Sequence, residues 1–141
     1  MRFFVDRCFP VQLCAALTAL HDGCHQIQYH DDHFANDTSD TAWLKAVGSW
    51  KPKPIVISGD TRILKRRDEV HELVAQDLMF VCLAPGWTET PIDEYAWRFM
   101  KAWSGIVAAV SKCNESCVFT VNHGASLKTE LYKVTRQISA K

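Results

Sequence analysis

Short, uninterrupted apolar runs alternate with segments of helical periodicity along most of this chain. Residues 55–57 (Ile-Val-Ile) form a continuous β-branched run, and residues 78–83 form a second apolar run. Such runs are typical of strands that are buried on both faces of a parallel sheet. Between them, apolar residues recur three and four positions apart, as on the inward face of a helix. Four strand–helix units in a row predict an α/β fold with a mainly parallel sheet.

The pattern gives approximate bounds for each element. Strands are expected at residues 2–5, 25–29, 55–57, 78–83 and 118–121. Helices are expected from Pro10 to Gly23, from residue 39 or 40 to about Trp50, and at 62–77 and 91–112. Residues 127–134 allow either a further strand or a short helix.

Composition narrows the class of protein. The 141 residues suit one domain with a real core, and 16 basic residues balance 16 acidic ones. Bulk charge therefore cannot drive nucleic-acid binding, so an RNA-binding protein of this kind would depend on local patches or metals. No apolar stretch is long enough to cross a membrane, and no export signal precedes the first strand, so we expect a cytoplasmic protein with no membrane partner. The six cysteines are then expected to be reduced thiols, with Cys113 and Cys117 only half of a zinc site.

Three acidic residues lie where ligands bind in such folds. Asp6 directly follows the first expected strand, Asp60 follows the third, and Asp40 begins the helix between them. Ligands of open α/β sheets bind beyond the carboxyl ends of the strands. Crowded carboxylates repel one another, and Mg²⁺ or Mn²⁺ resolves that repulsion through hard oxygen ligands. Such an ion can activate water against a phosphodiester.

Each acid also has a purely structural interpretation. Asp6 could cap the helix that follows it, and Ser39 or Asp40 could cap the next helix. Asp60 could form a turn or a cap.

Three segments of the sequence resemble a known family. They are residues 3–6 (Phe-Phe-Val-Asp), 39–44 (Ser-Asp-Thr-Ala-Trp-Leu) and 55–63 (Ile-Val-Ile-Ser-Gly-Asp-Thr-Arg-Ile). Together they resemble a PIN-like domain, closest to the small group placed with VapC-type toxins. The resemblance implies a three-layer α/β/α sandwich over residues 1–112, with residues 113–141 as an extension packed on it. It also implies a Mg²⁺- or Mn²⁺-dependent ribonuclease in which Asp6, Asp40 and Asp60 are the acids of the metal site.

The same resemblance suggests further residues and partners. A fourth acid is expected near the third, and Glu69 is the candidate, with Asp68 and Glu72 as alternatives. Arg62, two residues after Asp60, is the expected ligand of RNA phosphate. Toxins of this group are neutralised by an antitoxin protein and form homodimers. The competing hypotheses are a catalytically inactive PIN-like scaffold and, more weakly, a phosphatase or receiver-like domain that reacts at Asp60.

Other side chains are expected to be structural or solvated. The loop at residues 30–40, which includes His30 and His33, is expected to lie in solvent, with a transition-metal site as the alternative. The basic residues 65–67, which form a patch with Arg62, are expected on a solvated helix face, with the binding of RNA phosphates as the alternative. The aromatic residues of the last long helix, including Trp97 and Trp103, are expected in the core or, alternatively, in a groove for a partner helix.

Overall fold

The computed structural model describes residues 1–60, 62, 65–114, 116–124 and 127–129, the last three as backbone only. Within them, six strands form one sheet in the order β2-β1-β3-β4-β5-β6. The strands are β1 (Arg2–Val5), β2 (Gln26–Tyr29), β3 (Ile55–Ser58), β4 (Phe80–Leu83), β5 (Val118–Val121) and β6 (Leu127–Thr129). All neighbours pair in parallel except β6, which is antiparallel to β5. Residues 127–129 thus form a strand, whereas residues 130–134 of the same expected element lie outside the described part.

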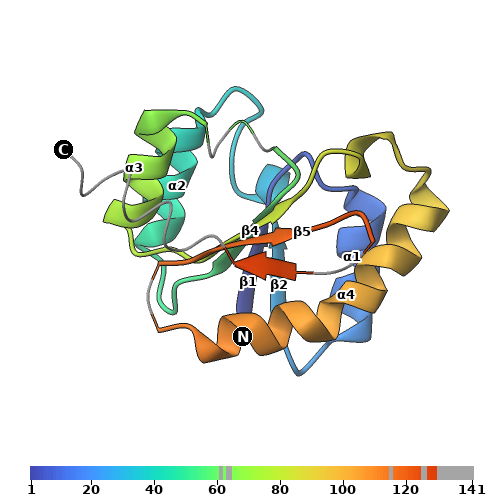
Figure 1. The fold of residues 1–141 in the computed structure, drawn as a ribbon. Helices are drawn as coiled ribbons and strands as arrows, with labels where there is room; N and C mark the ends of the chain where they lie inside the picture. The colour runs from blue at the N-terminus through green and yellow to red at the C-terminus, as the bar shows by residue number, and fades with distance from the viewer. Residues whose placement is uncertain (61, 63–64, 115, 125–126, 130–141) are drawn as a thin grey trace.

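Helices cover both faces of the sheet. They are α1 (Val11–Leu20), α2 (Asp40–Gly48), α3 (Arg67–Ala75) and α4 (Ile92–Lys112), with short 3-10 turns at His30–Asp32 and Trp87–Glu89. Figure 1 shows α1 and α4 on one side of the sheet and α2 and α3 on the other. The expected three-layer α/β/α sandwich is therefore confirmed.

The central strands β3 and β4 are almost entirely apolar because each face of the sheet has its own core. Phe3 and Val5 of β1 belong to the cluster that includes residues of α1 and α4. Phe4, between them, belongs to the cluster formed with α2 and α3. Successive strand residues point to opposite faces, so a central strand covered on both sides is buried along its length, as all four residues of β4 are.

The long helix α4 covers the sheet with one aromatic stripe. Tyr95, Phe99 and Trp103 recur every four residues, and all three are buried. Trp97 is 53% exposed, contrary to the core position expected for it. It lies two positions from Phe99, which is about 200° around the helix axis, so it points away from the sheet. There the Arg98 guanidinium lies 4.9 Å from the centre of its ring.

Three expectations about local structure are wrong. The helix expected at 62–77 is the shorter α3, which begins at Arg67, because Arg66 has an extended backbone (φ −93°, ψ 120°) as its N-cap. The strand expected at 78–83 begins only at Phe80. Cys113 and Cys117 are paired as a disulfide, whereas reduced thiols were expected.

None of the described helices is both long enough and apolar enough to span a bilayer.

Candidate active site

The candidate site lies where the direction of the chain across the sheet reverses. From β1 the chain passes to β2 at one edge, and it then crosses back to β3 on the other side of β1. Val5 is paired with Ile57, and the Asp6 backbone N–H donates to the Ile57 carbonyl at 2.8 Å. The carboxyl ends of β1 and β3 therefore lie side by side, which is the topological switch point of an α/β sheet.

Asp6 is fixed at the end of β1 by two hydrogen bonds. Asp6 is only 2% exposed. One carboxylate oxygen accepts from the Ser58 hydroxyl at 2.8 Å and the other from the Arg7 backbone N–H at 2.7 Å. Asp6 does not cap α1, whose N-cap is Pro10. Burial raises the pKa of Asp6, although both hydrogen bonds oppose that effect.

Ser58 links Asp6 to the next acid. Its hydroxyl oxygen also accepts from the Asp60 backbone N–H at 3.0 Å. The Asp60 carboxylate accepts from the Arg62 backbone N–H at 3.0 Å. This hydrogen bond closes a local turn, one of the structural alternatives for Asp60. The same carboxylate forms a forked ion pair with the Arg62 guanidinium, at 2.9 Å from Nε and 3.2 Å from Nη2. Burial raises the pKa of Asp60, but the hydrogen bonds and charge of Arg62 outweigh it, so the pKa is lowered overall.

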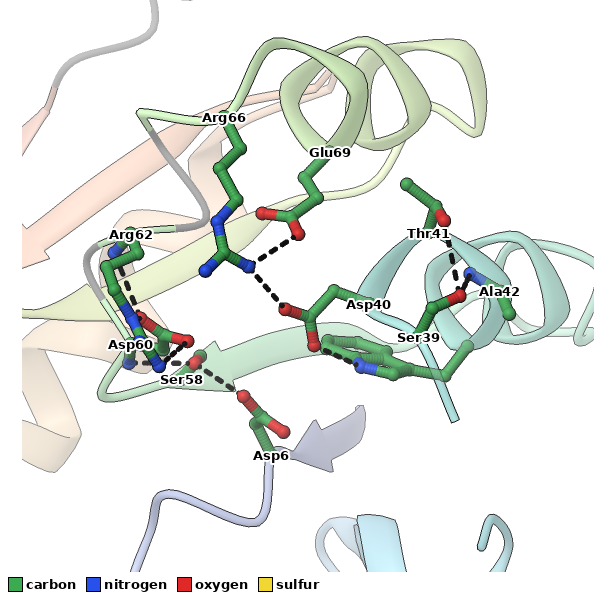
Figure 2. Close-up of polar contacts among 11 residues, drawn as sticks. Asp6, Ser39, Asp40, Thr41, Ala42, Ser58, Asp60, Arg62, Arg66 and Glu69 are labelled. Atoms are coloured by element: carbon green, nitrogen blue, oxygen red, sulfur yellow. Dashed lines mark hydrogen bonds and ion pairs between the residues drawn. The ribbon is translucent and has the colours of Figure 1, made fainter. Parts of the chain in front are cut away.

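Asp40 enters the site from the first turn of α2. The cap of this helix is Ser39, whose hydroxyl accepts from the Ala42 backbone N–H at 3.2 Å. The Asp40 carboxylate is therefore not used in capping. It accepts from the indole N–H of Trp43 at 2.8 Å, and its other oxygen lies 3.7 Å from Nη1 of Arg66 (Figure 2).

Glu69 enters from the first turn of α3 and is 7% exposed. Arg66 Nη1 donates to its Oε1 at 3.1 Å, whereas Oε2 is buried with no hydrogen-bond partner among the described residues. Burial raises the pKa of Glu69, Arg66 opposes this, and Asp40 adds to it. Of the two alternatives, Asp68 is exposed, and Glu72 accepts a hydrogen bond from the side chain of Gln76 instead.

The acids share one electrostatic environment. The charge of Asp40 raises the pKa values of both Asp6 and Glu69. Burial raises the pKa of the neighbouring Cys8 thiol to about 12, and the charges of Asp6, Asp60 and Asp40 act in the same direction. Figure 2 shows the carboxylates coming from separate elements and facing a common region.

The donor chemistry fits a hard divalent cation. Among the described residues the site offers carboxylate oxygens and the Ser58 hydroxyl, and Oε2 of Glu69 has no hydrogen-bond partner there. Mg²⁺ and Mn²⁺ prefer such oxygen ligands. Across the described residues, no three His, Cys, Asp or Glu side chains are already close enough to hold a metal ion. Instead Arg62 pairs with Asp60, and Arg66 pairs with Asp40 and Glu69, so a cation bound to these three carboxylates would compete with their ion pairs.

Sequence reasoning missed several residues around the acids. Ser58 and Trp43, which position carboxylates, were not singled out; Trp43 is only three positions from Asp40, whereas Ser58 contacts the carboxylate of Asp6, 52 positions away. Arg66 was expected on a solvated face but bridges two acids. His30 was expected in solvent but is 1% exposed, with its ring against Phe4 and Nδ1 at 2.8 Å from Asp31. His30 directly follows β2, so its position after a strand end was the available signal.

Comparison with known proteins gives one match. A family model described as "PIN like domain" matches residues 1–85, more than half of the chain. The matched part runs from β1 through β4 and includes all four acids of the site. Searches of curated proteins and of solved structures found no match.

Proposed function

Because this chain belongs to the PIN-like domain family, whose members are generally nucleases, we propose that it is a Mg²⁺- or Mn²⁺-dependent endoribonuclease. The observation that carries the proposal is the convergence of Asp6, Asp40, Asp60 and Glu69 at the switch point, with one buried carboxylate oxygen unpaired. PIN-like domains typically use divalent metals, and the side chains at this position supply the oxygen ligands that such ions prefer.

Each side chain has a defined part in the proposed reaction. Asp6, Asp40, Asp60 and Glu69 would hold the cation, which when bound supplies Lewis acidity and an activated water for phosphodiester hydrolysis. Ser58 fixes Asp6 and the backbone of Asp60 with one hydroxyl group. Arg62, whose side chain is 69% exposed, is placed to hold an RNA phosphate once it leaves Asp60.

Metal binding is the first test. Mn²⁺ is titrated into the wild-type protein and into Asp60→Asn, with binding followed by calorimetry. Saturable binding that the substitution abolishes is expected. Asp68→Asn is the matched control, because this exposed aspartate lies next to Glu69 in sequence but outside the site. If the wild-type protein binds no Mn²⁺, the proposed catalysis is wrong and a PIN-like binding module becomes the better interpretation.

Cleavage is the second test. The wild-type protein is expected to cut single-stranded RNA in the presence of Mn²⁺, whereas Asp6→Asn is expected to lose at least about a hundredfold in rate, as when a metal-site ligand or its support is removed. Equal rates for the two proteins would refute the assignment of Asp6.

We further propose that the ribonuclease is the toxin of a toxin–antitoxin pair and forms homodimers. The support is the resemblance of its three motifs to the VapC-type group. Expression of the wild-type chain in bacteria should then arrest growth, and expression of Asp6→Asn should not.

A further inference from the structure

Arg66 occupies a position between two acids of the candidate site. It comes just before α3, and its Nη1 atom lies 3.1 Å from Glu69 and 3.7 Å from Asp40 (Figure 2). One nitrogen thus serves two carboxylates that come from different helices.

These carboxylates need a positive charge. Glu69 is 7% exposed, its Oε2 has no hydrogen-bond partner among the described residues, and Asp40 acts on it as a like charge. A buried carboxylate next to another one is costly unless a cation neutralises the pair. In this structure that cation is the Arg66 guanidinium.

The same guanidinium is also available to a second ligand. Its side chain is 51% exposed, and its contacts with Asp40 and Glu69 are made by Nη1. The other terminal nitrogen points toward the Asp60–Arg62 pair, across the region that the acids face (Figure 2). Arginine carries five N–H donors in a planar fork that matches the geometry of a phosphate group.

We infer that Arg66 is an exchangeable counter-cation that pairs with Asp40 and Glu69 before metal binding and is displaced by the divalent cation to hold an RNA phosphate. The inference rests on the proposed function. A divalent cation bound to the same carboxylates would repel the Arg66 guanidinium, so metal binding and the Arg66 ion pairs compete with each other. Arg66 is thus a positioning residue that places substrate only after the metal is bound.

Metal affinity tests the first half of the inference without any catalysis. Mn²⁺ binding is measured by calorimetry for the wild-type protein, Arg66→Ala and Arg66→Lys. We expect Arg66→Ala to bind Mn²⁺ about three- to tenfold more tightly, because the competing ion pairs are gone. Arg66→Lys keeps the charge and should stay within about twofold of the wild type. Arg67→Ala is the matched control, because Arg67 is exposed and makes no ion pair within the described residues.

Steady-state cleavage of a short single-stranded RNA tests the second half. Arg66→Ala should raise KM about tenfold or more, as expected for the loss of a charge-assisted hydrogen bond, while kcat stays within about twofold. The dependence of log KM on log salt concentration should also fall by about 0.7, the contribution of one phosphate contact on a single strand. Arg66→Lys should bring KM part of the way back to the wild-type value. A loss of fold alone would not change the salt dependence of KM in this way.

The outcomes separate the two proposals. If the wild-type protein binds no Mn²⁺, the proposed function is wrong, and the exchange fails with it. If the wild-type protein binds Mn²⁺ but Arg66→Ala binds it no more tightly, the exchange is refuted and the proposed function stands. If Arg66→Ala binds Mn²⁺ more tightly with unchanged KM, the phosphate role of Arg66 is refuted.

Discussion

Replacing Glu69 with glutamine should stabilise the metal-free protein and weaken its response to metal. Glutamine keeps an oxygen that can accept from Arg66 Nη1, and it removes the negative charge beside Asp40. Its amide nitrogen takes the place of the buried Oε2, which is unpaired among the described residues, and can donate toward Asp40.

The size of the effect follows from two opposing contributions. A buried polar group without a partner costs about 1–3 kcal/mol. The ion pair with the half-exposed Arg66 offsets at most about 1 kcal/mol of this cost. The unfolding free energy of Glu69→Gln should therefore exceed that of the wild type by about 1 kcal/mol, or about 3–4 °C in Tm for a domain of this size.

Both pH and bound metal should change the difference in unfolding free energy between Glu69→Gln and the wild type. The pKa of Glu69 is raised in the folded protein, so the stability that this group contributes is present at low pH and is lost as pH rises through its folded pKa. Glutamine does not titrate, so its advantage should be small near pH 4 and full at pH 7. A metal at a hundred times its Kd stabilises the protein that binds it by about 2.7 kcal/mol, which should reverse the order in favour of the wild type.

Thermal and urea unfolding in EDTA and in Mn²⁺ provide the assay. Glu72→Gln is the control, since Glu72 lies on the same helix and already accepts a hydrogen bond from Gln76. If Glu69→Gln is less stable than the wild type in EDTA at pH 7, the Glu69 carboxylate is well paired in the metal-free state and the reasoning fails.

Three further predictions concern the surroundings of the acids. Trp43→Phe removes the indole donor to Asp40, so Mn²⁺ affinity measured by calorimetry should fall about tenfold, and unchanged affinity would mean that the bond does not orient the carboxylate. Ser58→Ala removes a buried hydroxyl that donates to Asp6 and accepts from the Asp60 backbone N–H, so urea unfolding should show an unfolding free energy lower by about 1–3 kcal/mol. A change below about 0.5 kcal/mol, the size typical of an exposed site, would contradict this. Cys8, with its pKa raised to about 12, should react with a disulfide reagent at pH 8 about fiftyfold more slowly than in the unfolded chain, because the scarcity of thiolate outweighs its greater nucleophilicity. Equal rates would refute the raised pKa, which comes first from burial and then from the surrounding acids.

The strand–helix order could be predicted because the sheet is covered on both faces. Two-sided burial makes runs such as residues 55–57 apolar without interruption, and this pattern is visible in the sequence without any knowledge of contacts. The positions of Asp6 and Asp60 follow from the same pattern, since each comes directly after a strand or its turn. Parallel pairing then places their backbones at one edge of the sheet.

Contacts between side chains could not be predicted in the same way. Arg66 resembles any basic residue near a helix start, and its bridging position depends on how α3 packs beside α2, which local sequence does not encode. Trp97 was misplaced for a simpler reason. A run of aromatic residues was treated as one stripe, although helical geometry places Trp97 and Phe99 on nearly opposite faces.

The cover that α4 provides over one face of the sheet has a consequence for the order in which the chain is made. All four acids lie before residue 70, and synthesis proceeds from the N-terminus. The aromatic stripe that buries one face of β1 and β3 arrives only with Tyr95, Phe99 and Trp103. Until the ribosome has added those residues, this side of the sheet is covered by α1 alone, so the core beneath the strand ends that carry the acids is incomplete. The nascent chain therefore carries the acids of the proposed ribonuclease before the core that supports them is complete.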